Sequence, residues 1–162
     1  MDQLTLQEQT ALLFRSWRSI EKLYDQYAKS LGMTSIGLII LEMIYSSPED
    51  ESCTQKTICE QTHLPKQSVN GFIKSFWEQG YVEMKEVRSD RRNKELRLSE
   101  SGKKYAETII GKILETEQKV FGQFTHDQRQ EIIKLFQNTE ISLKEMIHTN
   151  TNEQMTRRAN NE

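Results

Sequence analysis

Apolar residues in the first part of the chain recur at the spacing of an α-helix. Between residues 6 and 31 they follow one another at intervals of three or four positions, and Gly32 comes directly after the last of them: Leu13, Trp17, Ile20, Tyr24, Tyr27 and Leu31. This stripe predicts an amphipathic helix that ends at the glycine. Thr34 occupies an N-cap position, and the segment "SIGLIILEMIY" behind it is apolar nearly all round, which predicts a second, largely buried helix.

Two shorter helical segments follow the polar break "SSPEDES". Thr54 opens the first, "TQKTICEQTHL", in which Ile58 is expected to face inward. The second, "KQSVNGFIKSFWEQG", is closed by Gly80 and carries one apolar stripe, which consists of Val69, Phe72, Ile73 and Phe76. Because the tight turn "HLP" joins the two segments, they are predicted to form a helix-turn-helix.

After Gly80 the hydrophobic period changes from helical to alternating. The segments "YVEMKEV" and "KELRLS" alternate apolar and polar residues, and they flank the charged segment "RSDRRN". This pattern predicts a β-hairpin with a charged tip. A helix-turn-helix followed by such a hairpin is the order of elements in a winged helix.

Helical patterning resumes after Gly102 in two further stripes. The first contains Tyr105, Ile109, Ile113, Val120 and Phe124, and the second contains Ile132, Leu135, Phe136, Ile141, Leu143 and Ile147. We therefore expect a mostly α-helical protein with a small β-hairpin, in which a winged helix-turn-helix is combined with a helical dimerisation region. The expected parts are an N-terminal dimerisation helix (1–32), the winged helix-turn-helix (33–102), C-terminal dimerisation helices (103–148) and a disordered polar tail (149–162).

The composition indicates that these helices share a core with a second chain. Apolar residues make up 35% of the 162 residues, and the mean hydropathy is −0.73. Both values are low for a self-sufficient core. Because the terminal helices cannot all bury their apolar stripes on a winged helix this small, we expect a homodimer.

The distribution of charge, more than its total, indicates an anionic partner. The net charge is −2, but residues 54–105 contain eleven Lys and Arg against seven Asp and Glu, a net of +4, which leaves −6 on the remainder. Arginines at a hairpin tip can enter the narrow minor groove of A·T-rich DNA, and Gln and Asn on a helix can pair with adenine. We therefore predict double-stranded DNA as the partner.

The predicted DNA contacts lie on the second helix of the motif and on the hairpin. Lys66 and Thr54 stand at helix N-termini, where phosphate is favoured. Gly71 either allows close approach of the backbone or is a tolerated weak point in the helix, and Asp90 is expected to orient a neighbouring guanidinium group. The full set is Thr54, Lys66, Gln67, Ser68, Asn70, Gly71, Lys74, Arg88, Asp90, Arg91, Arg92 and Lys94.

The stretch "FWEQGYVEMKEVRSDRRNKELRLSESG" resembles the wing region of the MarR family of bacterial transcription regulators. The matching features are the exit Gly80-Tyr81-Val82, seven intervening residues, the tip Asp90-Arg91-Arg92, and the return Leu96-x-Leu98-Ser99-x-x-Gly102. The segment "MTSIGLIILEMI" is similar to the family's second helix. The chain departs from the family at Gly71, where many relatives carry Arg, and at Phe76-Trp77, which replaces a common Leu-Glu pair.

The resemblance implies a two-fold dimer in which the N- and C-terminal helices are intertwined. For such a dimer we expect a palindromic operator and a repressor that a small-molecule effector releases. The resemblance also implies an effector pocket between the dimerisation and DNA-binding parts, for which Trp17, Tyr24 and Tyr27 are candidates. Their helical spacing by itself favours ordinary core positions.

Other function classes lack a matching pattern. Without paired carboxylates, a Gly-rich phosphate loop or a nucleophile beside a base, we expect no enzyme and no cofactor. His63, His126 and His148 are too scattered to indicate a metal site. The N-terminus is not a secretory signal, and no apolar run reaches the roughly 18 residues of a membrane span, so a cytoplasmic protein is expected.

Two alternative functions remain open. One is a winged-helix module that binds another protein without DNA. The other is a cysteine-based redox regulator, because the chain contains Cys53 and Cys59. The simpler interpretation of these cysteines is that both are small, semi-buried residues.

Overall fold

The computed structural model describes residues 4–48, 53–87 and 90–159, with the backbone alone for 87, 90–93 and 151–159. It divides into two compact units, Met1–Lys112 and Ile113–Glu162, each of which is described by itself. The described chain is mostly α-helical with a two-stranded antiparallel hairpin. The predicted fold class is therefore confirmed.

Side-chain caps start the first two helices, and the cap at Thr34 is the one that the sequence predicts. α1 (Leu6–Ser30) begins with a capping box, in which the Thr5 hydroxyl accepts from the Glu8 N–H and the Glu8 carboxylate accepts from the Thr5 N–H. α2 (Ser35–Tyr45) is capped by Thr34. Leu38, Ile40, Leu41 and Ile44 of α2 are buried, whereas α1 leaves much of its apolar stripe exposed.

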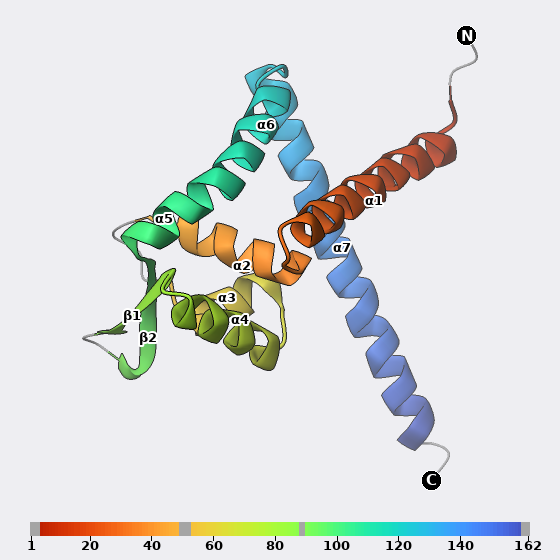
Figure 1. The fold of residues 1–162 in the computed structure, drawn as a ribbon. Coiled ribbons are helices and arrows are strands. Elements are labelled where there is room, and N and C mark those ends of the chain that lie inside the picture. The colour runs from red at the N-terminus through yellow and green to blue at the C-terminus, as the bar shows by residue number, and fades with distance from the viewer. Residues whose placement is uncertain (1–3, 49–52, 88–89, 160–162) are drawn as a thin grey trace. The chain divides into compact units, whose positions relative to one another are not determined.

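α3 (Gln55–Thr62) and α4 (Lys66–Glu78) form the predicted helix-turn-helix and lie beside each other in Figure 1. α3 ends at His63, which takes a left-handed φ of 56°. α4 turns one side toward the core, as its apolar stripe predicts. The buried residues of this side are Val69, Ile73 and Phe76.

The close approach of α2 and α4 depends on a glycine. A Cβ atom placed on Gly37 would lie 2.5 Å from Cε1 of Phe72, well inside contact distance. The absence of a side chain at Gly37 therefore allows the Phe72 ring to lie against α2. Because Phe72 belongs to α4, this contact helps to determine which side of α4 faces the core.

β1 (Val82–Val87) and β2 (Asp90–Leu98) form the predicted hairpin. In the register, Val82 lies opposite Leu98 and Met84 lies opposite Leu96. Val82 and Leu96 are buried, which confirms that the alternating pattern places one face of the hairpin on the core.

The tip of the hairpin differs from the prediction of an open charged loop between the strands. β2 already begins at Asp90, which pairs with Val87, and the next pair along the ladder joins Glu86 to Lys94. Residues 91–93 are therefore a bulge within β2. Early pairing at Asp90 shortens the turn, and the three extra residues are accommodated as an irregularity of one strand.

A segment before α3 joins the hairpin, which the hydrophobic pattern does not predict. The Leu96 N–H donates to the Cys53 carbonyl at 2.7 Å, and Thr54 forms an isolated bridge with Glu95. This pairing ties the start of α3 to β2. The helix-turn-helix and the hairpin are consequently held together by backbone hydrogen bonds as well as by the core.

α5 (Glu100–Ala106) begins where the hairpin returns to the α4–β1 connection. The Ser99 side chain caps α5, and its hydroxyl also donates to the Gly80 carbonyl at 2.6 Å. A Cβ atom on Gly102 would lie 1.9 Å from the Tyr81 carbonyl oxygen, so this junction requires glycine. α5 continues through a π-helical segment, η1 (Glu107–Gly111).

The second unit is helical. α6 (Lys112–Phe121) begins at the last residue of the first unit, and α7 (His126–Ala159) follows. The prediction of a disordered tail at 149–162 is wrong as far as Ala159, because α7 continues to that residue. Its polar residues include Glu, Gln and Arg, which are good helix formers.

Many apolar side chains of α6 and α7 are exposed. They are Val120, Ile133, Leu135, Phe136, Ile141, Leu143, Met146 and Ile147.

Within the described ranges, no helix taken singly is long and apolar enough to cross a membrane. α1 and α2 together, bent by 89°, would meet the requirement on length and composition alone.

Two glycine-to-alanine substitutions should change stability in opposite directions. Gly102→Ala should lower the free energy of unfolding by about 2 kcal/mol or more, because the new methyl group meets a backbone carbonyl. Gly71→Ala should raise it by about 0.5–1 kcal/mol, because a Cβ there meets no atom within 4 Å and alanine is the better helix former. Urea denaturation followed by circular dichroism at one protein concentration measures both. Equal midpoints for the two variants would contradict the packing described for Gly102.

Candidate nucleic-acid interface

α4 presents a polar face to solvent. Gln67, Asn70, Gly71 and Lys74 are exposed, and Ser68 is half-buried. These residues share the helix with the buried apolar stripe, so core packing determines that they point outward. Lys74 lies 3.7 Å from Glu78 in a solvent-exposed ion pair, an interaction weak enough to leave the ammonium group available to another anion.

The N-terminus of α4 has no side-chain cap. Pro65 occupies the N-cap position and cannot provide a capping oxygen, and the first turn contains no acidic residue. The first N–H groups of the helix therefore lack side-chain acceptors, and the positive end of the helix dipole is not offset. Such an end favours phosphate, and Lys66, the first helical residue, adds a positive charge beside it.

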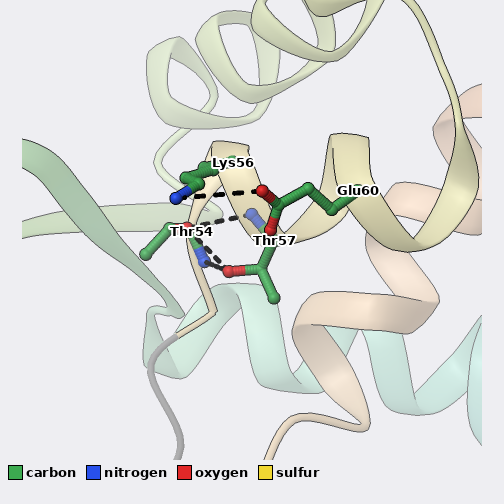
Figure 2. A network of polar contacts seen from close by, with 4 residues as sticks. All are labelled: Thr54, Lys56, Thr57 and Glu60. Atoms are coloured by element: carbon green, nitrogen blue, oxygen red, sulfur yellow. Dashed lines mark hydrogen bonds and ion pairs between the residues drawn. The ribbon is translucent and has the colours of Figure 1, made fainter.

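The start of α3 is different, as Figure 2 shows. The Thr54 hydroxyl accepts a hydrogen bond from the Thr57 N–H at 3.1 Å, and the Thr57 hydroxyl accepts one from the Thr54 N–H at 3.3 Å. Lys56, in the same first turn, pairs with Glu60 one turn further along at 3.8 Å. The Thr54 hydroxyl is thus engaged in capping α3, and a phosphate contact from this residue stays a prediction.

A side-chain bridge joins the starts of the two helices. Nε2 of Gln55, the first residue of α3, donates to the carbonyl of Lys66, the first residue of α4, at 3.1 Å. This hydrogen bond fixes the position of the N-terminus of α4 relative to that of α3. Sequence reasoning does not single out Gln55, because a polar residue in a first turn carries no signal of a long-range partner.

The hairpin contributes further positive charge. Lys94 is exposed, whereas Arg97 is engaged with Glu95 of the same strand, with Nη2 2.7 Å from Oε1. The remaining predicted contacts of the hairpin fall into two groups: Asp90, Arg91 and Arg92, whose backbone lies in β2 at its turn end, and Arg88, which lies outside the described residues.

Comparison with known proteins connects this interface to a family. A sequence model of the MarR family matches residues 31–93, the segment that contains α2, α3, α4 and β1. The regulator SarZ of Staphylococcus epidermidis is 29% identical over 129 residues, which cover 78% of this chain and 82% of SarZ. Over these residues the chain is similar to the MarR family.

Solved structures of MarR-family proteins share the fold. The regulator NMB1585 from Neisseria meningitidis is 27% identical, with a TM-score of 0.71 over 88% of this chain and 98% of that protein. MepR from Staphylococcus aureus, in a form described as its DNA-binding conformation, is 19% identical, with a TM-score of 0.70 over 83% of this chain and 98% of MepR. The structure of MepR bound to DNA has a TM-score of 0.62 at 18% identity and covers 87% of this chain and 99% of MepR.

The chain also contains a cavity of about 750 Å³ between the end of α2, the hairpin and α5. Lys85, Lys104 and Glu107 are among its lining residues. The Tyr45 hydroxyl donates a hydrogen bond to the Glu107 carboxylate, and that hydrogen bond raises the pKa of Tyr45. The aromatic residues predicted for an effector pocket, Trp17, Tyr24 and Tyr27, are not among the described residues that line this cavity.

The two cysteines differ in exposure. Cys53 is buried beside β2 and Cys59 is half-buried. Burial raises the pKa of the Cys53 thiol. A side-chain hydrogen bond with Ser47 acts in the opposite direction, and the nearby Glu95 carboxylate adds a smaller increase. The thiolate is the reactive form, so a raised pKa makes Cys53 less reactive at neutral pH. This environment is that of a structural cysteine.

In the folded protein at pH 7, Cys53 should react with a thiol reagent far more slowly than in the denatured protein, because both burial and its raised pKa suppress the thiolate. The Cys59→Ser variant isolates Cys53, and absorbance of the released thiolate product follows its modification in native buffer and in denaturant. Equally fast modification in both conditions would contradict the buried, high-pKa environment.

Proposed function

We propose that this MarR-family transcriptional regulator binds DNA as a homodimer and that α4 reads the operator. The observation that supports this most strongly is the division of α4. One side is buried in the core, and the other exposes Gln67, Asn70 and Lys74 behind an uncapped N-terminus. A recognition helix requires this combination of a fixed orientation and an exposed polar face.

Each part of the proposed interface has a separate role. Gln67 and Asn70 can pair with adenine at base edges in the major groove. Lys66, the first N–H groups of α4 and Lys74 bind phosphate. Arg91 and Arg92 of the hairpin supply phosphate and minor-groove contacts.

The dimer is proposed from the apolar surface that single chains leave uncovered. α1 exposes Leu12 and Trp17 at 51% and 43% of their residue surface, and α7 exposes Ile141 and Ile147 at 54% and 57%. Several large apolar side chains exposed on one helix mark a surface that contacts another molecule. A two-fold dimer built from them would place two copies of α4 on a palindromic operator.

We further propose that the protein is a cytoplasmic repressor, acts by binding without catalysis, and is released from DNA by a small effector. The cavity beside Tyr45, which is partly open to solvent, lies next to the hairpin and is one candidate site. The stripe of Trp17, Tyr24 and Tyr27 is a second candidate that would need the partner chain for completion. Suppose that the hairpin exchanges between a position that fits DNA and one that does not. An effector that binds the second position better would increase the fraction of molecules in that position.

Arg92→Ala and Asn70→Ala should weaken DNA binding in different ways. Arg92→Ala should weaken binding to the operator and to unrelated DNA alike, and each lost phosphate contact should flatten the slope of log affinity against log salt by about one. Asn70→Ala should cost about 1–3 kcal/mol on the operator and much less on unrelated DNA, because it removes a base contact. Fluorescence anisotropy on both duplexes at two salt concentrations measures these effects.

Asp90→Ala is the matched charge control in the same measurement. If Asp90 orients a guanidinium group, its loss should weaken binding in spite of removing a negative charge. Tighter binding by this variant would contradict the orienting role. An unchanged affinity for Arg92→Ala would exclude the hairpin as a DNA contact. A parent protein that binds neither duplex would favour a protein-binding module.

A further inference from the structure

Trp77 lies on the face of α4 that we assign to DNA. Gln67, Asn70, Lys74 and Trp77 follow one another at intervals of three, four and three residues, the spacing that keeps side chains on one side of a helix. Trp77 is seven residues beyond Asn70, which is close to two full turns. The two side chains therefore leave the helix in nearly the same direction.

The side chain of Trp77 is unusually exposed for its type. It retains 52% of its surface, and Ile39 at 40% is the other large hydrophobic residue exposed among the described residues of 33–102. Among the described residues, none accepts a hydrogen bond from the Trp77 indole N–H. The remaining exposed apolar residues belong to α1, α6, α7 and their flanking segments, so Trp77 is not part of the surface assigned to dimerisation.

An α4 that crosses the major groove would carry Trp77 to the edge of that groove. Seven residues of α-helix span about 10 Å, and a major groove is about 12 Å wide. When the N-terminal half of a recognition helix meets the base edges, a residue 10 Å further along the same face, by the same estimate, reaches the groove wall. That wall is the sugar-phosphate backbone.

We propose that Trp77 docks on the sugar-phosphate backbone beside the groove, with the indole N–H donated to a phosphate oxygen and the ring covering a deoxyribose. The inference rests on the proposed function, because it requires α4 to bind DNA. Indole combines a large apolar ring with one hydrogen-bond donor. The ring can pack on a sugar while the N–H donates to the neighbouring phosphate. Lys74, one turn before Trp77 on the same face, binds the same strand.

The proposed contact has a recognisable dependence on salt. Indole is neutral, so it displaces no condensed counterion when it meets a phosphate. Loss of Trp77 should therefore lower affinity without changing the slope of log affinity against log salt. Loss of Lys74 should lower affinity and flatten that slope. The contact should also be indifferent to sequence, because the backbone is the same for every duplex.

The experiment compares Trp77→Ala, Trp77→Phe, Lys74→Ala and the parent protein on an operator duplex and an unrelated duplex. Trp77→Ala should weaken binding to both by about tenfold or more, because the dimer loses the contact twice. Trp77→Phe retains an aromatic ring and loses the donor, so its loss should be smaller, about threefold. Ile39→Ala, which removes the other exposed hydrophobic residue of the winged helix, is the matched control and should bind as the parent does.

Fluorescence gives a second readout that does not depend on the stability of an alanine variant. Addition of DNA to the parent should quench tryptophan emission, and the quenching should disappear in Trp77→Phe although that variant still binds. Sedimentation should give the same oligomeric state for the parent and both Trp77 variants.

The outcomes separate the inference from the function on which it rests. If the parent binds DNA and Trp77→Ala binds equally well, the inference is wrong and the proposed function stands. A loss of affinity that accompanies dissociation of the dimer would assign Trp77 to the subunit contact and also overturn the inference. If the parent binds no DNA, both proposals fail together.

Discussion

The contact between Phe72 and Gly37 determines how α4 is rotated about its axis. The ring lies so close to α2 that a single methyl group at Gly37 would fall 2.5 Å from it. Val69, Ile73 and Phe76 are buried on the same helix. A helix held in this way cannot turn without losing core packing, since protein interiors tolerate few voids. The exposed residues of α4 are therefore a consequence of what its other side buries.

The N-termini of α3 and α4 differ because a side-chain oxygen is available to cap only the first. Thr54 and Thr57 cap α3 with reciprocal hydrogen bonds, so that helix end is closed. α4 begins after Pro65, which offers no capping oxygen, and its first turn lacks acidic residues. Since Gln55 holds the Lys66 carbonyl, the closed end of α3 positions the open end of α4. α3 thus supports α4, and the N-terminus of α4 has N–H donors available to an anion.

Local patterns predict the helices of this chain well, because apolar periodicity and caps act over a few residues. The caps at Thr34 and Thr54 and the buried stripe of α4 could be read directly from the sequence. Features that depend on distant partners could not be predicted. The pairing of Cys53 with β2, the need for glycine at 102 and the lining of the cavity beside Tyr45 all involve residues far apart in the chain.

The start of β2 and the length of α7 are the two places where local patterning misled. A run of charged residues suggested an open loop, but early pairing of Asp90 with Val87 turned part of it into a strand with a bulge. A polar composition suggested disorder after residue 148, but residues that favour helix continued α7 to Ala159. In both segments, polar residues form regular secondary structure, a strand in the first and a helix in the second. The base-contact roles of Gln67 and Asn70 stay predictions.

The central claim is that two copies of α4, held in a two-fold dimer, read DNA sequence. Selection of bound duplexes from a random pool by the full-length protein tests it most directly. We expect enrichment of a palindrome whose half-sites are about one helical turn apart, the spacing that two major-groove helices of a dimer require. Enrichment of a single unrepeated site would contradict the dimeric arrangement, and a pool that stays random after repeated selection would contradict sequence reading by α4.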